Sequence, residues 1–248
     1  MAVVWREAHE QTTYEVRSQG RTLRLFANGV QHSEFHPDRL VTGSVWDLLW
    51  LPGFFAKPGS IKRVLILGLG GGSLVPPLRR LFSPESMLAV ELDAFHLQVA
   101  KRFFSVEDFG VECHCADAVE FLNHWDGPPF DLIIEDLFAP SDRTVSRAVS
   151  ATGRWFGTLS KHVSKHGVLV MNFGDWPEYR DSWTAGDTAM RGWANRFRLS
   201  TPDCHNAVMA WTRDEKDASV LRERLRDHPE LEKELSDGRL DYRASKIS

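Results

Sequence analysis

Residues 63–74, with the sequence RVLILGLGGGSL, decide the fold of this chain. The run 64–67 is apolar at every position, which is typical of a strand buried on both faces of a sheet. Glycines follow at 68 and 70–72, and residues without a Cβ allow a sharp turn and a close approach of a ligand to the backbone. A helix is expected over 74–82. Strand, glycine-rich turn and helix in this order indicate the first unit of an α/β sheet.

The same alternation continues along the chain. Further strands are predicted at 87–92, 111–115, 130–135 and 168–173, and the helices between them at 94–104, 118–124 and 147–164. Two more segments, 196–200 and 207–212, are expected to pair as edge strands. The pattern predicts a doubly wound, mostly parallel, seven-stranded α/β sheet.

Two smaller regions flank this predicted domain, which covers 46–213. Residues 1–45 contain short alternating strands and are expected to form a β-hairpin appendage. Residues 214–248 are highly charged, and their leucines form a thin apolar stripe at helical spacing. We expect a helical tail that packs on the body of the protein. A role of this tail in binding a partner or capping a dimer is the alternative.

Length and composition restrict the class of protein. The chain has 248 residues, a formal net charge of −4, 42% hydrophobic and 26% charged residues. These values are typical of a globular domain, and the acidic balance argues against broad nucleic-acid binding. No run of about twenty apolar residues predicts a membrane span, and the N-terminus turns charged too early for a signal peptide. A cytoplasmic location is therefore expected.

The three cysteines, Cys113, Cys115 and Cys204, do not predict a disulfide framework. Their number is odd and no CxxC motif occurs, so a reducing compartment is expected. Cys113 and Cys115 could be read as metal ligands, but no second ligand pair occurs at zinc spacing. We therefore predict two buried strand cysteines and no metal site.

Acidic residues stand at the carboxyl ends of successive predicted strands, and no lysine or arginine stands among them. These residues are Glu91, Asp93, Asp117, Glu135, Asp136 and Asp175. Ligands of open parallel sheets bind at this edge. Ser73 occupies the third glycine position of a dinucleotide fingerprint, so a dinucleotide fits poorly. A rim of carboxylates without cationic neighbours suits a positively charged adenosyl sulfonium better than a phosphate.

The chemistry of each acidic residue follows from its place in this pattern. Glu91 lies about twenty residues after the glycine turn, where a carboxylate can accept both ribose hydroxyls, and without a ligand its burial would be costly. Asp117 is expected to accept a hydrogen bond from the adenine amino group. Asp136 would lie beside the sulfonium as general base. Each could instead be a helix cap. Trp176 is a candidate lid over the cleft.

The chain resembles a known family in several of these motifs. The motifs are RVLILGLGGGSL, AVELDAFHLQVAKRFF, ADAVEFL and FDLIIEDLF, followed by GVLVMN and NAVM. Together they resemble the spermidine synthase-like branch of the class I S-adenosylmethionine-dependent methyltransferase fold. The resemblance covers roughly residues 20–213. It implies a methyltransferase-type sheet and S-adenosylmethionine, or its decarboxylated form, as the donor.

The resemblance also implies a role for individual residues. Asp136 matches the catalytic aspartate of the family. The residues that match donor-binding positions are Gln31, Gly68, Gly70, Gly72, Glu91, Asp117 and Ala118. Within this set the glycines would wrap the methionine part of the donor, Glu91 would bind the ribose, and Asp117 the adenine.

Three departures concern the diamine side of the family's site. Gly71 and Ala139 stand where aminopropyltransferases carry aspartates, and the segment 37–40 lacks the family's tyrosine. An ammonium group without a carboxylate partner would be poorly compensated there. Methyl and aminopropyl transfer to a small-molecule acceptor therefore both stay open. The alternative is a non-catalytic nucleoside-binding or scaffold protein. A homodimer is expected, with no nucleic-acid or membrane partner.

Overall fold

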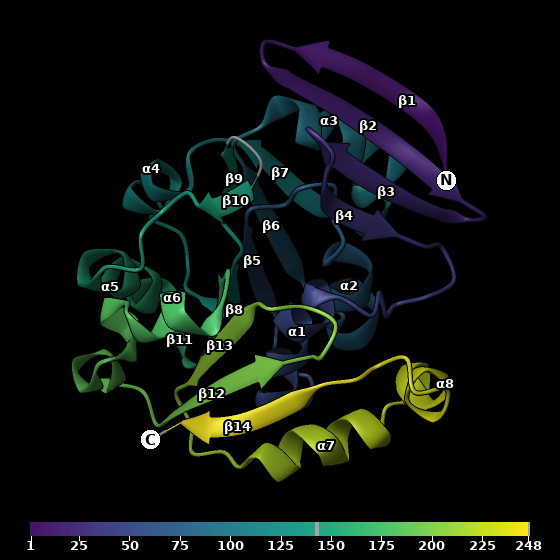
Figure 1. Cartoon of the computed structure of the whole chain (residues 1–248). Helices are drawn as coiled ribbons and strands as arrows, with labels where there is room; N and C mark the ends of the chain where they lie inside the picture. The colour runs from purple at the N-terminus through teal and green to yellow at the C-terminus, as the bar shows by residue number, and fades with distance from the viewer. Residues whose placement is uncertain (142–143, 248) are drawn as a thin grey trace.

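The computed structural model describes residues 1–141 and 144–247, and its centre is an eight-stranded sheet in the order β14-β12-β13-β11-β8-β5-β6-β7 (Figure 1). Five neighbouring strands are parallel. They are β11 (Val163–Phe173), β8 (Phe130–Glu135), β5 (Arg63–Leu67), β6 (Ser86–Glu91) and β7 (Val111–Cys115). The predicted doubly wound, mostly parallel α/β fold with an N-terminal β appendage is confirmed.

The other edge of this sheet is antiparallel. It consists of β13 (Ala207–Thr212), β12 (Asn195–Ser200) and β14 (Arg243–Ile247). The sequence predicted seven strands, and β14 is the eighth. The tail is thus not only helical, because β14 follows α7 (Ala218–Arg226) and α8 (Glu232–Ser236).

Helices cover both faces of the sheet because alternate side chains of each strand point to opposite sides. Val64 and Ile66 pack in the core with α1 (Val45–Trp50), α2 (Val75–Phe82), α3 (Ala94–Phe103) and α7. Leu65 and Leu67 belong to the opposite core, with α4 (Ala118–Asn123), α5 (Gly153–His162) and α6 (Trp176–Arg180). Within the described residues, no helix has the length and apolar composition that a membrane span requires.

A separate four-stranded antiparallel sheet forms the N-terminal region. Its strands are β1 (Ala2–His9), β2 (Thr12–Gln19), β3 (Thr22–Ala27) and β4 (Val30–Phe35), in that order. Figure 1 shows this sheet in purple, at the opposite end of the view from the yellow tail. It docks on the glycine turn, because Ser33 Oγ accepts the Gly71 amide at 2.6 Å and the Glu34 amide donates to Ser73 Oγ at 2.8 Å.

The predicted helix over 147–164 is wrong at both ends. Arg147 instead ends a short hairpin of β9 (Phe138–Ser141) and β10 (Thr144–Arg147), and residues 148–152 are neither helix nor strand. Helix α5 begins only after Thr152, whose hydroxyl accepts the Trp155 amide as an N-cap, and β11 begins at Val163.

The prediction of two buried strand cysteines is also wrong. Cys113 is half-buried and Cys115 is exposed. The physical reason is that β7, which carries both residues, lies at the edge of the sheet.

Candidate active site

A cavity of about 470 Å³ opens at the carboxyl ends of the parallel strands. Of the residues singled out from the sequence, those that line it are Gln31, Gly68, Gly70, Glu91, Asp93, Asp117, Ala118, Asp136 and Ala139. Strand β4 contributes Gln31, β6 ends at Glu91, and α4 begins with Ala118. Gly72 is not part of the lining. The fold thus collects residues from five segments of the chain around one space.

The glycine turn fits closely against its surroundings at two positions. Gly68 has φ +86°, and a Cβ there would lie 2.1 Å from the backbone oxygen of Asp136. Only glycine therefore lets this turn pass the strand end that carries Asp136. Gly72 has φ +98°, and its Cβ would meet Val106 Cγ1 at 2.5 Å. Gly72 thus serves the packing beneath the turn.

Gly71 explains one departure from the family pattern. A Cβ at this position would lie 1.9 Å from Phe104 Cε2 and 2.9 Å from Ser33 Cβ. Phe104 is fully buried, so it cannot move aside without opening the core. No side chain fits at position 71, and an aspartate is excluded there by packing.

Glu91 is buried at the end of β6, with 9% of its surface exposed. One carboxylate oxygen accepts the amides of Leu69 and Gly70 at 3.0 and 2.8 Å, and the other accepts the Asp93 amide at 2.9 Å. Burial raises the pKa of Glu91, but His96 and these amides outweigh it and hold the pKa below its ordinary value. The expectation that Glu91 lacks partners without a ligand is therefore wrong: the backbone supplies them.

Asp117 lies at the exposed rim of the cavity and caps α4. Its Oδ1 accepts the amides of Val119 and Glu120 at 2.8 and 2.9 Å. Asp93 caps α3 in the same way, and its other oxygen accepts the Tyr14 hydroxyl at 2.7 Å. Both residues are helix caps that also face the cavity. The cap and the ligand-binding interpretations are thus compatible.

Asp136 follows β8 and has a different environment. Its Oδ1 accepts the side-chain amide of Asn172 at 2.7 Å. Burial is the main cause that raises the pKa of Asp136 to about 6, and the negative charges of Glu135 and Glu91 add to it. The Asn172 hydrogen bond and the charge of Arg147 act in the opposite direction. The Asp136 carboxylate is therefore ionised at neutral pH and is poised to accept a proton.

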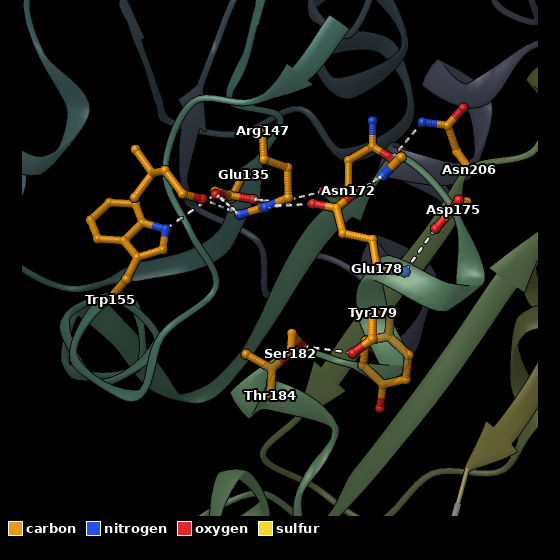
Figure 2. A network of polar contacts seen from close by, with 12 residues as sticks. Glu135, Arg147, Trp155, Asn172, Asp175, Glu178, Tyr179, Ser182, Thr184 and Asn206 are labelled. Carbon is orange, nitrogen blue, oxygen red and sulfur yellow. Dashed lines mark hydrogen bonds and ion pairs between the residues drawn. The ribbon is translucent and has the colours of Figure 1, made fainter.

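Glu135, which precedes Asp136 in the chain, forms a buried ion pair with Arg147 that the sequence did not predict (Figure 2). The Arg147 side chain is 4% exposed and that of Glu135 is fully buried. Arg147 Nη1 donates to Glu135 Oε2 at 2.9 Å, and Trp155 Nε1 donates to Glu135 Oε1 at 3.1 Å. The rim of carboxylates thus has a cationic neighbour, and the expectation that it has none is wrong. A glutamate inside the apolar strand 130–135 was the signal, because a buried carboxylate needs such a partner.

The sequence also did not predict the aromatic and histidine side chains that line the cavity. Trp46, at the start of α1, lines the cavity, whereas Trp176 does not. The Trp176 ring packs against Tyr179, so the prediction that it forms a lid is wrong. His32 and His96 line the cavity with ring centroids 4.9 Å apart.

Burial, with the nearby charge of His96, lowers the pKa of His32 to about 4, so His32 is neutral. For His96, burial lowers the pKa, but Glu91 and Asp93 outweigh it and the net shift is upward. Among the residues that the structure describes, no group of three or more histidine, cysteine or acidic side chains is placed to hold a metal ion.

Comparison with known proteins identifies the sequences and folds that the chain resembles. Residues 47–219 match the family model described as the spermine/spermidine synthase domain. The polyamine aminopropyltransferase of Vibrio vulnificus is 34% identical over 160 residues, which are 63% of this chain and 52% of that protein. The spermine synthase of Arabidopsis thaliana is 32% identical over 116 residues, which are 44% of this chain and 31% of that protein. The chain spans about a third to a half of the length of these curated relatives.

Solved structures share the fold at low sequence identity. A probable spermidine synthase from Corynebacterium glutamicum has a TM-score of 0.74 and 17% identity, with 92% of this chain and 89% of that chain covered. Human methyltransferase-like protein 13, in complex with SAH, has a TM-score of 0.60 and 17% identity, with 77% of this chain and 92% of that chain covered.

Proposed function

Because the chain belongs to the spermine/spermidine synthase family, we propose that its cavity binds decarboxylated S-adenosylmethionine and that it transfers the aminopropyl group to an amine. The observation that carries this proposal is the placement of Glu91 and Asp136 in one cavity with opposite pKa shifts. One carboxylate stays charged for a ligand, and the other can accept a proton near neutral pH.

The adenosine half of the donor is assigned to the ends of β5, β6 and β7. Glu91 accepts the ribose hydroxyls, Asp117 contacts the adenine beside Ala118, and Gln31 and the glycine turn contact the chain on the sulfur. The described lining residues include four carboxylates and neither lysine nor arginine. A donor with a carboxylate of its own would face like charges, so the decarboxylated donor fits better.

The reaction is a displacement at carbon. The acceptor nitrogen attacks the propyl carbon bonded to sulfur, the C–N bond forms, and the C–S bond breaks with its electron pair going to sulfur. Methylthioadenosine leaves, and Asp136 takes the proton from the acceptor nitrogen. Alignment of the two substrates supplies most of the acceleration. A positioned base contributes about 10²–10⁴-fold.

We assign the acceptor to the part of the cavity around Asp136. Leu137, Phe138 and Ala139 follow Asp136 in the lining, Trp46 also lines the cavity, and the polar groups next to Asp136 are the uncharged amides of Asn172 and Asn206. A second ammonium of a diamine would find no carboxylate partner among these groups, which is costly. We therefore assign an acceptor with a single reactive amine on an apolar body.

Product analysis tests this proposal. The protein is incubated with decarboxylated S-adenosylmethionine and a panel of apolar monoamines and diamines, and methylthioadenosine is quantified. Methylthioadenosine formed with monoamines, and not by Asp136→Asn, is the expected result. S-adenosylhomocysteine formed from S-adenosylmethionine would instead show methyl transfer. Absence of product together with absence of calorimetric binding of either donor would leave a non-catalytic protein.

A further inference from the structure

Asn172 joins three parts of the site. It lies near the end of β11, is 3% exposed and lines the cavity. Its side-chain nitrogen donates to Asp136 Oδ1 at 2.7 Å, and its side-chain oxygen accepts Asn206 Nδ2 at 3.1 Å. Its backbone carbonyl accepts a hydrogen bond from Arg147 (Figure 2). Asn206, Asn172 and Asp136 are thus linked by two hydrogen bonds in series: the Asn206 amide donates to Asn172, and the Asn172 amide donates to Asp136.

The direction of these two hydrogen bonds affects the charge that Asp136 can carry. A side-chain amide can turn by 180°, which exchanges its donor and acceptor ends. With the Asn206 amide donating to it, the oxygen of Asn172 faces Asn206 and the NH2 group faces Asp136. In the reversed orientation the Asn172 oxygen would face the Asp136 carboxylate, and two NH2 groups would meet at Asn206. Asn206, as the structure places it, and the Asp136 carboxylate therefore favour the same orientation of Asn172, the one that stabilises an ionised Asp136.

We propose that Asn172, oriented by Asn206, is a positioning residue that fixes one oxygen of Asp136 and keeps this carboxyl group ionised near neutral pH. The second Asp136 oxygen is then left for the proton of the acceptor. The role of these hydrogen bonds in catalysis rests on the proposed function. Their effect on the ionisation of Asp136 can be measured in the protein without substrates.

The charges around Asp136 determine what loss of Asn172 does. Glu135 on β8 and Glu91 on β6 disfavour its ionised form, as does burial, and Arg147 on β10 favours it. Loss of the Asn172 hydrogen bond leaves Arg147 as the remaining group that favours ionisation. A hydrogen bond to a charged group is strong enough to shift a titration midpoint by about one to two pH units. The Asp136 midpoint should therefore rise from about 6.

The test is an NMR titration of the whole protein labelled with ¹³C at the aspartate carboxyl groups, without substrate. The Asp136 signal is assigned by its loss in Asp136→Asn. We expect the midpoint to rise by about one pH unit or more in Asn172→Leu. A smaller rise is expected in Asn206→Leu, where Asn172 remains but can turn. Asn206 is half-buried in a loop, so its variant tests the proposal if Asn172→Leu does not fold.

Asn195 provides a matched control. It is a fully buried asparagine on β12, bonded to Thr212 and to the Asp214 carbonyl. Asn195→Leu should lower the melting temperature and leave the Asp136 midpoint unchanged. An unchanged midpoint in Asn172→Leu and Asn206→Leu would overturn the proposal. Because no substrate is used, this result is independent of whether the proposed transfer is observed.

Discussion

Glu91 ends β6 and Asp136 follows β8, the two strands that flank β5, and both residues line the same cavity, yet their pKa values are shifted in opposite directions. Glu91 accepts three backbone amides and lies 3.7 Å from the His96 ring nitrogen. The Asp136 side chain accepts one side-chain amide, next to the buried Glu135. The half of the cavity that we assign to the donor thus holds a stabilised anion, and the half that we assign to the acceptor holds a destabilised one.

The opposite pKa shifts suit the two carboxylates to different roles, Glu91 to binding a ligand and Asp136 to proton transfer. A carboxylate whose charge is supported by the backbone can accept hydroxyl groups without changing its protonation state. A carboxylate that lacks this support can take up a proton during a reaction. Substitution of each carboxylate should therefore affect a different step, Asp136 the turnover and Glu91 the binding of the donor.

Substitution of Asp136 should have the largest effect. Asp136→Asn should lower turnover by about 10²–10⁴-fold, because the proton acceptor is lost. Calorimetric affinity for the decarboxylated donor should stay within a few-fold, since the donor contacts are intact. Full turnover in this variant would remove Asp136 from the mechanism.

The reverse pattern is expected for Glu91. Glu91→Ala should weaken donor binding by about 1–3 kcal/mol, through loss of hydrogen bonds to a charged group. Turnover at saturating donor should change much less. Glu112→Gln, on the exposed surface of β7, is the matched control and should bind as the wild type does. Unchanged donor affinity in Glu91→Ala would contradict the assignment of the donor half.

The raised pKa of Asp136 also predicts an effect on stability. Between its ordinary pKa of 3.8 and about 6, the native state binds more protons than the unfolded chain, so the free energy of unfolding falls as pH rises through this window. Asp136→Asn should therefore be more stable than the wild type at pH 8, by about 1–3 kcal/mol. Urea unfolding at pH 8 and pH 4 checks this, and the difference should fall to about 0.5 kcal/mol at pH 4, just above the ordinary pKa. An equal difference at both values would contradict it.

The smallest expected change concerns the acceptor. Ala139→Asp should raise the preference for diamines over monoamines about three- to tenfold, because a partly exposed ion pair contributes little. Competition assays with mixed acceptors measure this ratio. A ratio equal to that of the wild type would show that position 139 does not face the distal end of the acceptor.

Local patterns predicted the centre of the molecule well. The apolar run of β5, the glycine turn and the acidic strand ends are all contained in short segments, so the sheet and the residues at its edge could be inferred. The contacts that the sequence did not reveal are formed over longer distances. Strand β14 pairs with β12 only after α7 and α8 have returned the chain to the sheet edge.

The buried pair of Glu135 and Arg147 escaped prediction for the same reason. The hairpin of β9 and β10, which was not predicted, brings Arg147 back to Glu135, and Arg147 was expected to begin a helix. Two of the three amide partners of Glu91 come from the glycine turn, more than twenty residues earlier. Charge compensation in this site is therefore set by tertiary structure, whereas the acidic strand ends are visible in the sequence alone.

The most direct test of the division between Glu91 and Asp136 compares two pH dependences in the wild type and in Asp136→Asn. Turnover at saturating donor should fall in the wild type as pH decreases through about 6, and donor affinity should follow the same pH curve in both proteins. A wild-type turnover that is flat through this range, or a donor affinity that loses its pH dependence in Asp136→Asn, would contradict the account.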